Sequence, residues 1–177
     1  MKNTFIAWKA ILNYGLIAGA LFTIVILVSY LIEPLMWIGD LPKEAQEKIG
    51  EVPPDVLPMG WIFFLSTVAI FIVFPVLMNK KIFNQQPENA SFWNFFLHAL
   101  LLANFVNLVD LIIVDILIFD TIQPDFMMIE GAEEYIREYV NAGFHFIGFL
   151  KGQPWMLSFA AISAGISMAF RRKKVVH

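Results

Sequence analysis

The sequence contains no cysteine, which excludes disulfide bonds, thiolate catalysis and cysteine-ligated metals. It is also poor in charge, because Lys, Arg, Asp and Glu together make up only 15% of its 177 residues. Familiar catalytic and nucleotide-binding motifs are missing as well: there is no G-x-x-x-x-G-K-[ST], no G-x-G-x-x-G after a strand, no H-E-x-x-H and no G-x-S-x-G. These absences count against the corresponding enzyme classes.

The chain is instead rich in apolar residues, with 59% hydrophobic content and a mean hydropathy of +0.69, which lies outside the usual range of soluble domains. A membrane-spanning helix needs about 20 mostly apolar residues. Four runs meet or nearly meet that requirement: 10–32, 59–78, 92–119 and 153–170. The sequence therefore predicts an all-α polytopic membrane protein, in which residues 1–177 form a single domain of four transmembrane helices.

The charged residues are sorted between the connections and predict the orientation. Acidic residues dominate the loops 33–58 and 120–152. Basic residues near the ends of spans stay in the cytoplasm, and eight of the 12 lie at the N-terminus, in the 79–90 turn and in the tail: Lys2, Lys9, Lys80, Lys81, Arg171, Arg172, Lys173 and Lys174. We expect a cell-membrane protein with both termini cytoplasmic and both acidic loops outside.

Tryptophan supports this threading without any reference to charge, because its ring prefers the headgroup level of a bilayer. All five tryptophans lie near the ends of the apolar runs: Trp8, Trp37, Trp61, Trp93 and Trp155. In the outer loops we expect short amphipathic helices, one of two turns over 41–49 and one over 133–149. In the second of these, apolar and aromatic residues recur at intervals of three and four.

Two pairs of small residues, each four positions apart, mark surfaces on which helices pack closely. The first run contains Gly15 and Gly19, and the last contains Ala161 and Gly165. We expect contacts inside the bundle more than a dimerisation face.

Residues 107–120, NLVDLIIVDILIFD, place Asp110, Asp115 and Asp120 five residues apart in an apolar run. An α-helix advances by about 100° per residue, so a spacing of five predicts that the three acids do not share a face. With about 1.5 Å of rise per residue from Trp93, Asp110 falls inside the hydrocarbon core, Asp115 near the outer headgroups and Asp120 in water.

A polar stripe formed by Asn104, Asn107, Asp110 and Asp115 occupies a sector of about 140° on the same α-helical wheel. One interpretation is a hydrated cavity, open to the outside, that binds a cation, a proton or a polar ligand. The other is a set of hydrogen bonds between helices. The sequence leaves both open.

The histidines His98 and His145 lead to different expectations. With Asn94 one turn earlier, His98 is expected to bond a backbone carbonyl or to lie at the inner interface, rather than to relay protons. His145 precedes the last apolar run and, with Asp115 and Asp120, suggests a carboxylate–histidine site. Metal binding there would need three convergent ligands. A surface or capping histidine is the alternative.

The segments NLVDLIIVDILIFD and FHFIGFLKG, with the intervening IQPDFMMIEGAEE, resemble small bacterial four-helix membrane proteins of uncharacterised function. The resemblance covers roughly the C-terminal half of the chain. It implies architecture alone, and no activity or catalytic residue is carried over from it.

Three functions follow in order of weight. The first is a non-enzymatic accessory or interaction module, with the lipid bilayer and a membrane protein or a second copy as partners. The second is a membrane protein that binds a small ligand, cation or proton, such as a transporter or channel subunit. The third is a membrane enzyme with an outward-facing carboxylate–histidine site. No cofactor is expected, and nucleic acid is not, because topology and anionic lipid explain the basic tail.

Overall fold

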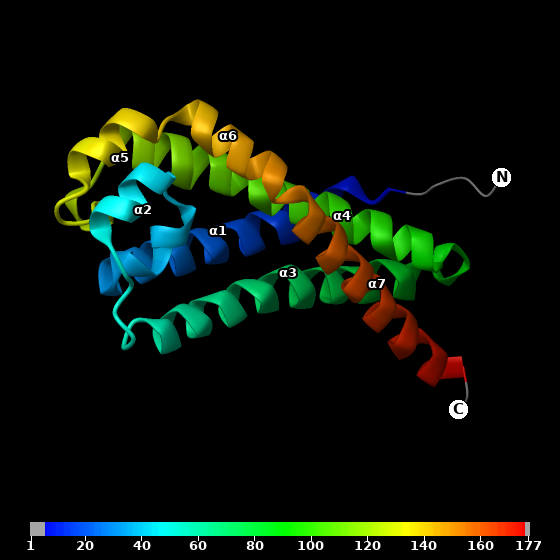
Figure 1. Cartoon of the computed structure of the whole chain (residues 1–177). Coiled ribbons are helices and arrows are strands. Elements are labelled where there is room, and N and C mark those ends of the chain that lie inside the picture. Colours follow the sequence, from blue (N-terminus) through cyan, green and yellow to red (C-terminus); the bar gives the residue numbers. More distant parts are fainter. Residues whose placement is uncertain (1–5, 176–177) are drawn as a thin grey trace. The chain divides into compact units, whose positions relative to one another are not determined.

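The computed structural model describes residues 6–175, and the side chains of all of these except Asp40, Tyr139 and residues 172–175. Lys2 and the side chains of Arg172, Lys173 and Lys174, which were used for the orientation, therefore lie outside the described residues. Every regular element from residue 6 to residue 175 is helical, which confirms the all-α class (Figure 1): α1 (Trp8–Ile32), η1 (Pro34–Asp40), α2 (Lys43–Ile49), α3 (Leu57–Gln85), η2 (Pro87–Asn89), α4 (Phe92–Val109), η3 (Asp110–Ile122), η4 (Asp125–Met127), α5 (Glu133–Tyr139), α6 (Ala142–Lys151) and α7 (Gln153–Val175).

Within the described residues, three helices are long and apolar enough to cross a membrane: α1, α3 and the continuous helix Phe92–Ile122 that α4 and η3 form together. They coincide with the first three predicted spans. The fourth span corresponds to α7 and stays a prediction, as does the orientation of the chain.

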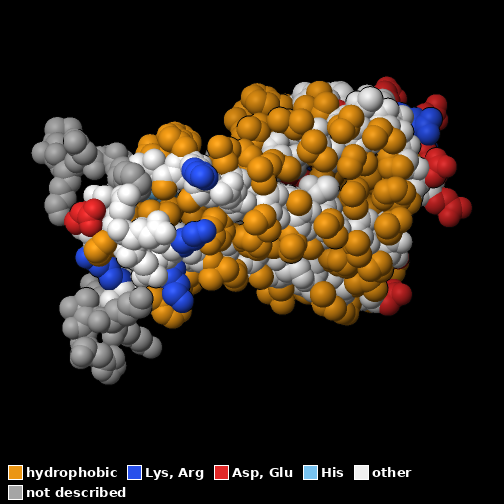
Figure 2. Space-filling model, turned by 180° about the vertical axis from the view of Figure 1, so that it is seen from behind, with side chains coloured by type: hydrophobic (Ala, Val, Ile, Leu, Met, Phe, Trp, Pro, Cys, Tyr) orange, Lys and Arg blue, Asp and Glu red, His pale blue; other side chains and the backbone are white. Residues whose placement is uncertain are grey.

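The exterior of these helices is apolar. Large side chains such as Leu16, Leu65 and Trp93 are 60% or more exposed, and hydrophobic side chains cover most of the face that Figure 2 shows. A soluble protein rarely exposes so much contiguous apolar surface. In a bilayer, lipid chains cover it at no cost, which fits the membrane character of the chain.

The chain divides into two compact units. Unit 1 comprises Met1–Ala20, Val68–Asn107 and Gly152–His177, and unit 2 comprises Leu21–Thr67 and Leu108–Lys151. The expectation of a single domain over 1–177 stays a prediction.

Unit 1 packs through aromatic rings and small residues. Phe71 of α3 stacks on Phe159 of α7 with ring centroids 5.5 Å apart. Phe83 meets Phe95 edge-on at 4.6 Å. Gly15 is buried where α1 passes α4, since a Cβ built on it would lie 2.5 Å from a ring carbon of Phe105. Only glycine permits so close an approach, so this pattern, with Gly19 also buried, packs inside the chain.

On α7 the packing register differs from the expected one. Ala161 and Gly165 are exposed, and a Cβ at Gly165 would meet nothing within 4 Å. The buried small residues of α7 lie one position before Ala161 and Gly165 or two positions after them. They are Ala160, Ser163, Ala164 and Ser167. The expectation of contacts inside the bundle is therefore wrong for Ala161 and Gly165, because the serine face of α7 is the one that turns inward. A contact of this pair with another chain stays a prediction.

In unit 2 the long helix changes its winding. From Asp110 to Ile122 it is a π-helix of 13 residues, with backbone hydrogen bonds running five residues back. At its end the Gln123 N–H donates to the Ile118 carbonyl at 2.8 Å, and the Thr121 hydroxyl donates to Ile116. Side chains five apart lie nearly above one another in such a helix. The sequence predicted that Asp110, Asp115 and Asp120 do not share a face of the helix. That prediction was wrong, because it assumed α-helical winding.

The outer-loop helices are partly as expected. The predicted two turns over 41–49 are confirmed by α2. The single helix over 133–149 is wrong: the segment forms α5 and α6, because the Asn141 side chain accepts hydrogen bonds from the N–H groups of Gly143 and Phe144 and begins a new helix. Lys48 of α2 lies 4.3 Å above the Tyr135 ring of α5, which joins the two loop helices.

Candidate functional site

His145 of α6 lies between two carboxylates of η3. Its Nδ1 is 3.4 Å from Asp115 Oδ1, and its Nε2 is 3.2 Å from Asp120 Oδ1. The helix α6 runs alongside η3, as Figure 1 shows. We call Asp115, His145 and Asp120 the carboxylate–histidine cluster.

The five-residue spacing of the acids has its physical explanation here. Because η3 is a π-helix, Asp115 and Asp120 project from the same side of it, one repeat apart. A single imidazole, whose two nitrogens point in different directions, can then meet both of them. Long π-helices are rare, and shorter π-segments are frequent at functional sites.

The cluster is largely removed from solvent. The side chain of His145 is 11% exposed, that of Asp120 15% and that of Asp115 27%. The rings of Phe119 and Phe144 lie edge-on to the imidazole, each with its centroid 5.6 Å away, and contribute to this burial. Within the described part of the chain, Asp120 Oδ2 is buried and accepts no hydrogen bond. Charge in such a setting is costly unless it is neutralised.

The number of protons on the imidazole decides how many of its two carboxylate contacts are hydrogen bonds. A neutral imidazole carries one N–H and one lone pair, so it can donate to only one of two carboxylates. The other nitrogen then faces a carboxylate oxygen with no proton between them. Uptake of one proton turns both contacts into N–H···O hydrogen bonds. The arrangement is therefore that of a proton-binding site.

Burial lowers the pKa of the His145 imidazole below its ordinary value of 6.5, and the Asp120 carboxylate opposes that shift by its charge and its hydrogen bond. The charged groups placed against the imidazole are Asp115 and Asp120, both from η3. Protonation of His145 therefore needs a lower pH than protonation of an exposed histidine.

The four residues of the predicted polar stripe lie in different surroundings, and the stripe as a site stays a prediction. Asn104 donates to the carbonyl of Leu100 in its own helix at 3.0 Å. The Asn107 amide nitrogen is buried and has no hydrogen-bond partner among the described atoms. Asn104 and Asn107 belong to unit 1, whereas Asp110 and Asp115 belong to unit 2. Asp110 is half-buried at the first residue of η3, and Asp115 joins His145.

The metal hypothesis for Asp115, Asp120 and His145 receives no support from this arrangement. Among the side chains that the structure describes, no group of three or more His, Asp and Glu is placed to hold a metal ion. The carboxylates approach opposite nitrogens of the ring, so the donor atoms surround the imidazole and do not converge on a common point.

His98 behaves as expected from the sequence. It is completely buried in unit 1, where Nε2 accepts the Ala7 N–H at 3.0 Å. Because a backbone N–H can only donate, Nδ1 must carry the proton, and it donates to the Asn94 carbonyl at 2.7 Å. The predicted bond to a backbone carbonyl is confirmed. His98 is a neutral structural residue that fixes the segment before α1 to α4.

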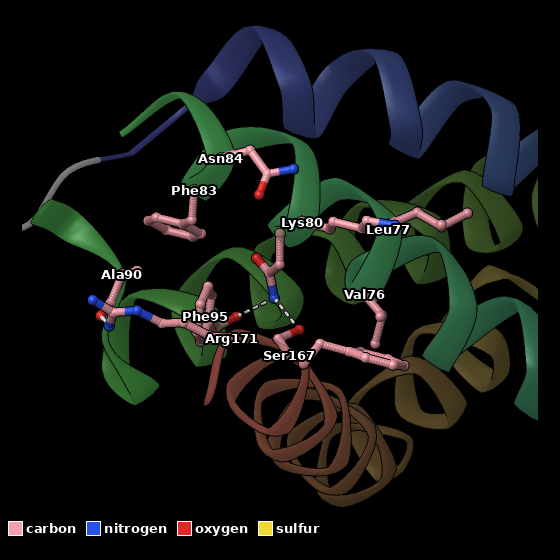
Figure 3. A pocket seen from close by; sticks show the side chains of 11 residues that line it. Val76, Leu77, Lys80, Phe83, Asn84, Ala90, Phe95, Ser167 and Arg171 are labelled. Atoms are coloured by element: carbon pink, nitrogen blue, oxygen red, sulfur yellow. Dashed lines mark hydrogen bonds between the residues drawn. The ribbon is translucent and has the colours of Figure 1, made fainter. Parts of the chain in front are cut away.

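Sequence reasoning missed a second polar site in unit 1. Asn79 is completely buried and donates to the Phe95 carbonyl at 3.1 Å and to the Ser167 hydroxyl at 3.3 Å, the bonds dashed in Figure 3. It lines a cavity of about 390 Å³. The available signal was the pair Ser163 and Ser167, four residues apart in the last apolar run, which marks a polar helix face.

Comparison with known protein families, with curated proteins and with solved structures finds no match to this chain. The resemblance to small bacterial four-helix membrane proteins therefore stays a prediction, and the site must be interpreted from its own chemistry.

Proposed function

We propose that this chain is a non-enzymatic integral membrane module with four spanning segments and both termini in the cytoplasm, and that it responds to protons through its carboxylate–histidine cluster. Three candidate spans support the membrane location. Sorting of charge supports the orientation: Lys9, Lys80, Lys81 and Arg171 belong to unit 1, whereas most described acidic residues belong to unit 2.

The observation that carries the proton site is the position of one imidazole between two carboxylates. With His145 neutral, one of its two carboxylate contacts lacks a hydrogen. With His145 protonated, α6 is bonded to η3 at two points one π-repeat apart. Burial nevertheless disfavours the protonated imidazole while the helices are packed, so proton uptake favours their separation. The contact is therefore held less firmly at acidic pH, and it is a two-state element that protons bias.

Amide hydrogen exchange of the full chain in lipid nanodiscs tests this function. On going from pH 8 to pH 5, after correction for intrinsic exchange, we expect the amides of 142–151 to become less protected, because the packed imidazole binds a proton less readily than the exposed one. His145→Gln should abolish the difference, because glutamine does not titrate. Asp115→Asn is the second variant: it keeps Asp120 and removes one carboxylate that stabilises the protonated imidazole, so the loss of protection at acidic pH should be larger. A response that persists in His145→Gln, or none in the wild type, contradicts the proposal.

The same experiment separates a proton from a metal cation. If protons are the ligand, the loss of protection at pH 5 is independent of added sodium, calcium or zinc. Protection that instead follows one cation at constant pH would assign the cluster to that ion.

A further inference from the structure

Unit 1 contains a cavity that the proton site does not use. It lies where the last turns of α3, the start of α4 and the end of α7 meet, and its volume of about 390 Å³ is in the range of small-ligand pockets. Most of its lining is apolar, including Val76, Leu77, Phe83 and Phe170. Figure 3 shows the cavity with Lys80, Ser167 and Arg171 among its lining residues.

Asn79 is a completely buried polar residue of this lining. Its amide nitrogen faces two acceptors, the Phe95 carbonyl and the Ser167 oxygen. The Ser167 oxygen is an acceptor because its own proton goes to the Ser163 carbonyl at 2.7 Å. The amide therefore cannot be flipped, and the atom left over is the carbonyl oxygen Oδ1. That oxygen is buried and accepts no hydrogen bond from any described group, so a matching ligand must present a donor.

Two basic side chains also line this cavity. Lys80 lines the cavity and is exposed. The Arg171 guanidinium donates to the backbone carbonyls of Ala90 and Pro87, which fixes its position at the cavity. A guanidinium has five N–H donors, so donors remain for an anion.

We propose that this cavity binds an anionic glycerophospholipid whose headgroup carries a hydroxyl. The headgroup hydroxyl donates to Asn79 Oδ1, the phosphate pairs with Lys80, and the first part of the acyl chains contacts Val76 and Phe170. A free phosphate ion would leave the apolar lining without a partner, and a choline headgroup has no donor for Asn79. The inference rests on the membrane location of the chain and is independent of the proton site.

Native mass spectrometry of the purified full chain, with lipids added to detergent micelles, tests this directly. Three lipids with identical acyl chains are compared: phosphatidylglycerol, phosphatidylmethanol with the same charge but no hydroxyl, and phosphatidylcholine. We expect phosphatidylglycerol to bind about fivefold more tightly than phosphatidylmethanol, for one hydrogen bond, and phosphatidylcholine to bind most weakly. Glycerol phosphate, which lacks chains, should not displace the lipid.

The adjacent lysines offer a matched pair of variants. Lys80→Gln should weaken phosphatidylglycerol about fivefold, the effect of one lysine on an anionic lipid. Lys81→Gln removes the same charge, but Lys81 lies 5.8 Å from the centroid of the Tyr14 ring and lines a different cavity, so binding should be unchanged. Val76→Trp fills the cavity and should abolish the preference for phosphatidylglycerol over phosphatidylcholine.

Each of the three experiments can overturn the inference. None of them requires a substitution of the buried Asn79, which could unfold the chain. Equal binding of the three lipids would show that no specific site exists. Equal effects of Lys80→Gln and Lys81→Gln would reduce the attraction to general surface charge. Survival of the lipid preference in Val76→Trp would place the lipid elsewhere.

Discussion

Each unit of this molecule contains a histidine on a helix contact, fully buried at His98 and largely buried at His145, and the two are partnered in opposite ways. His98 in unit 1 bonds to two backbone groups, the Ala7 N–H and the Asn94 carbonyl. His145 in unit 2 faces two carboxylates, those of Asp115 and Asp120. Backbone partners satisfy the neutral imidazole completely, whereas two carboxylates leave it one proton short. Partner chemistry, more than burial, therefore separates a structural histidine from a titratable one.

The helices that present these partners differ as well. α4 in unit 1 is a regular α-helix, in which Asn94 lies one turn before His98. η3 in unit 2 is a π-helix, whose looser winding brings side chains five apart onto one side. The acidic spacing of the sequence fits the second geometry and not the first.

The largest expected effect concerns the orientation of the chain in the membrane. The chain has no cysteine, so single cysteines can be introduced without background. Glu130→Cys should react fully with a membrane-impermeant maleimide in intact cells, and Lys80→Cys only after the cells are opened. Labelling of Lys80→Cys in intact cells would reverse the proposed orientation.

The two histidines should differ in what they contribute to stability. His98→Ala leaves the Ala7 N–H without its partner and opens a buried space, so we expect the free energy of unfolding to fall by about 3 kcal/mol. His145→Gln at pH 8 replaces the imidazole by a side chain of similar size that still has an N–H donor. The free energy of unfolding should fall by less than about 1 kcal/mol. Denaturant titration in detergent measures both. Equal losses would erase the contrast between them.

A smaller effect is expected from the small residues. Gly15→Val places side-chain atoms against Phe105, and forcing the ring aside should cost about 2 kcal/mol. Gly165→Val, in open space on α7, is the control and should change stability by no more than about 0.5 kcal/mol. A larger loss for Gly165→Val, at concentrations where the protein self-associates, would show that this face packs against a second copy.

The smallest effect is the pH dependence of stability. Because the folded-state pKa of His145 is lowered from 6.5, the unfolded chain binds more protons than the folded chain between these two values. Stability should therefore fall as the pH drops below about 6.5, with a slope from this group of at most about 1.4 kcal/mol per pH unit. His145→Gln should lose this contribution. An unchanged slope in the variant would assign it to other groups.

Composition and periodicity were sufficient for much of the fold. Apolar runs predicted the three long helices, and Asn94 before His98 predicted a backbone bond, because both depend on local spacing. The break at Asn141 was missed since a capping residue was read as part of a continuous amphipathic pattern. The π-helix was missed because helical wheels assume one winding.

The sites were harder to predict for the same reason. Asp115, Asp120 and His145 were identified as candidates, yet their mutual geometry depends on the winding of η3 and on how α6 packs against it. Asn79 gave almost no signal, because one asparagine beside two lysines is ordinary at the end of a span. Its role becomes visible only when Phe95 and Ser167, distant in sequence, are seen to fix its amide.

The most direct test of the comparison is a pH titration of the chain labelled with nitrogen-15 at histidine, followed by NMR in lipid nanodiscs. The account predicts that His98 keeps the chemical shifts of one neutral tautomer, with the proton on Nδ1, from pH 8 to pH 5. It predicts that His145 takes up a proton at a lower pH than an exposed histidine, and that Asp120→Asn lowers the pKa of His145 further by removing the opposing carboxylate. Identical titration of the two histidines, or a His145 signal unaffected by Asp120→Asn, would contradict it.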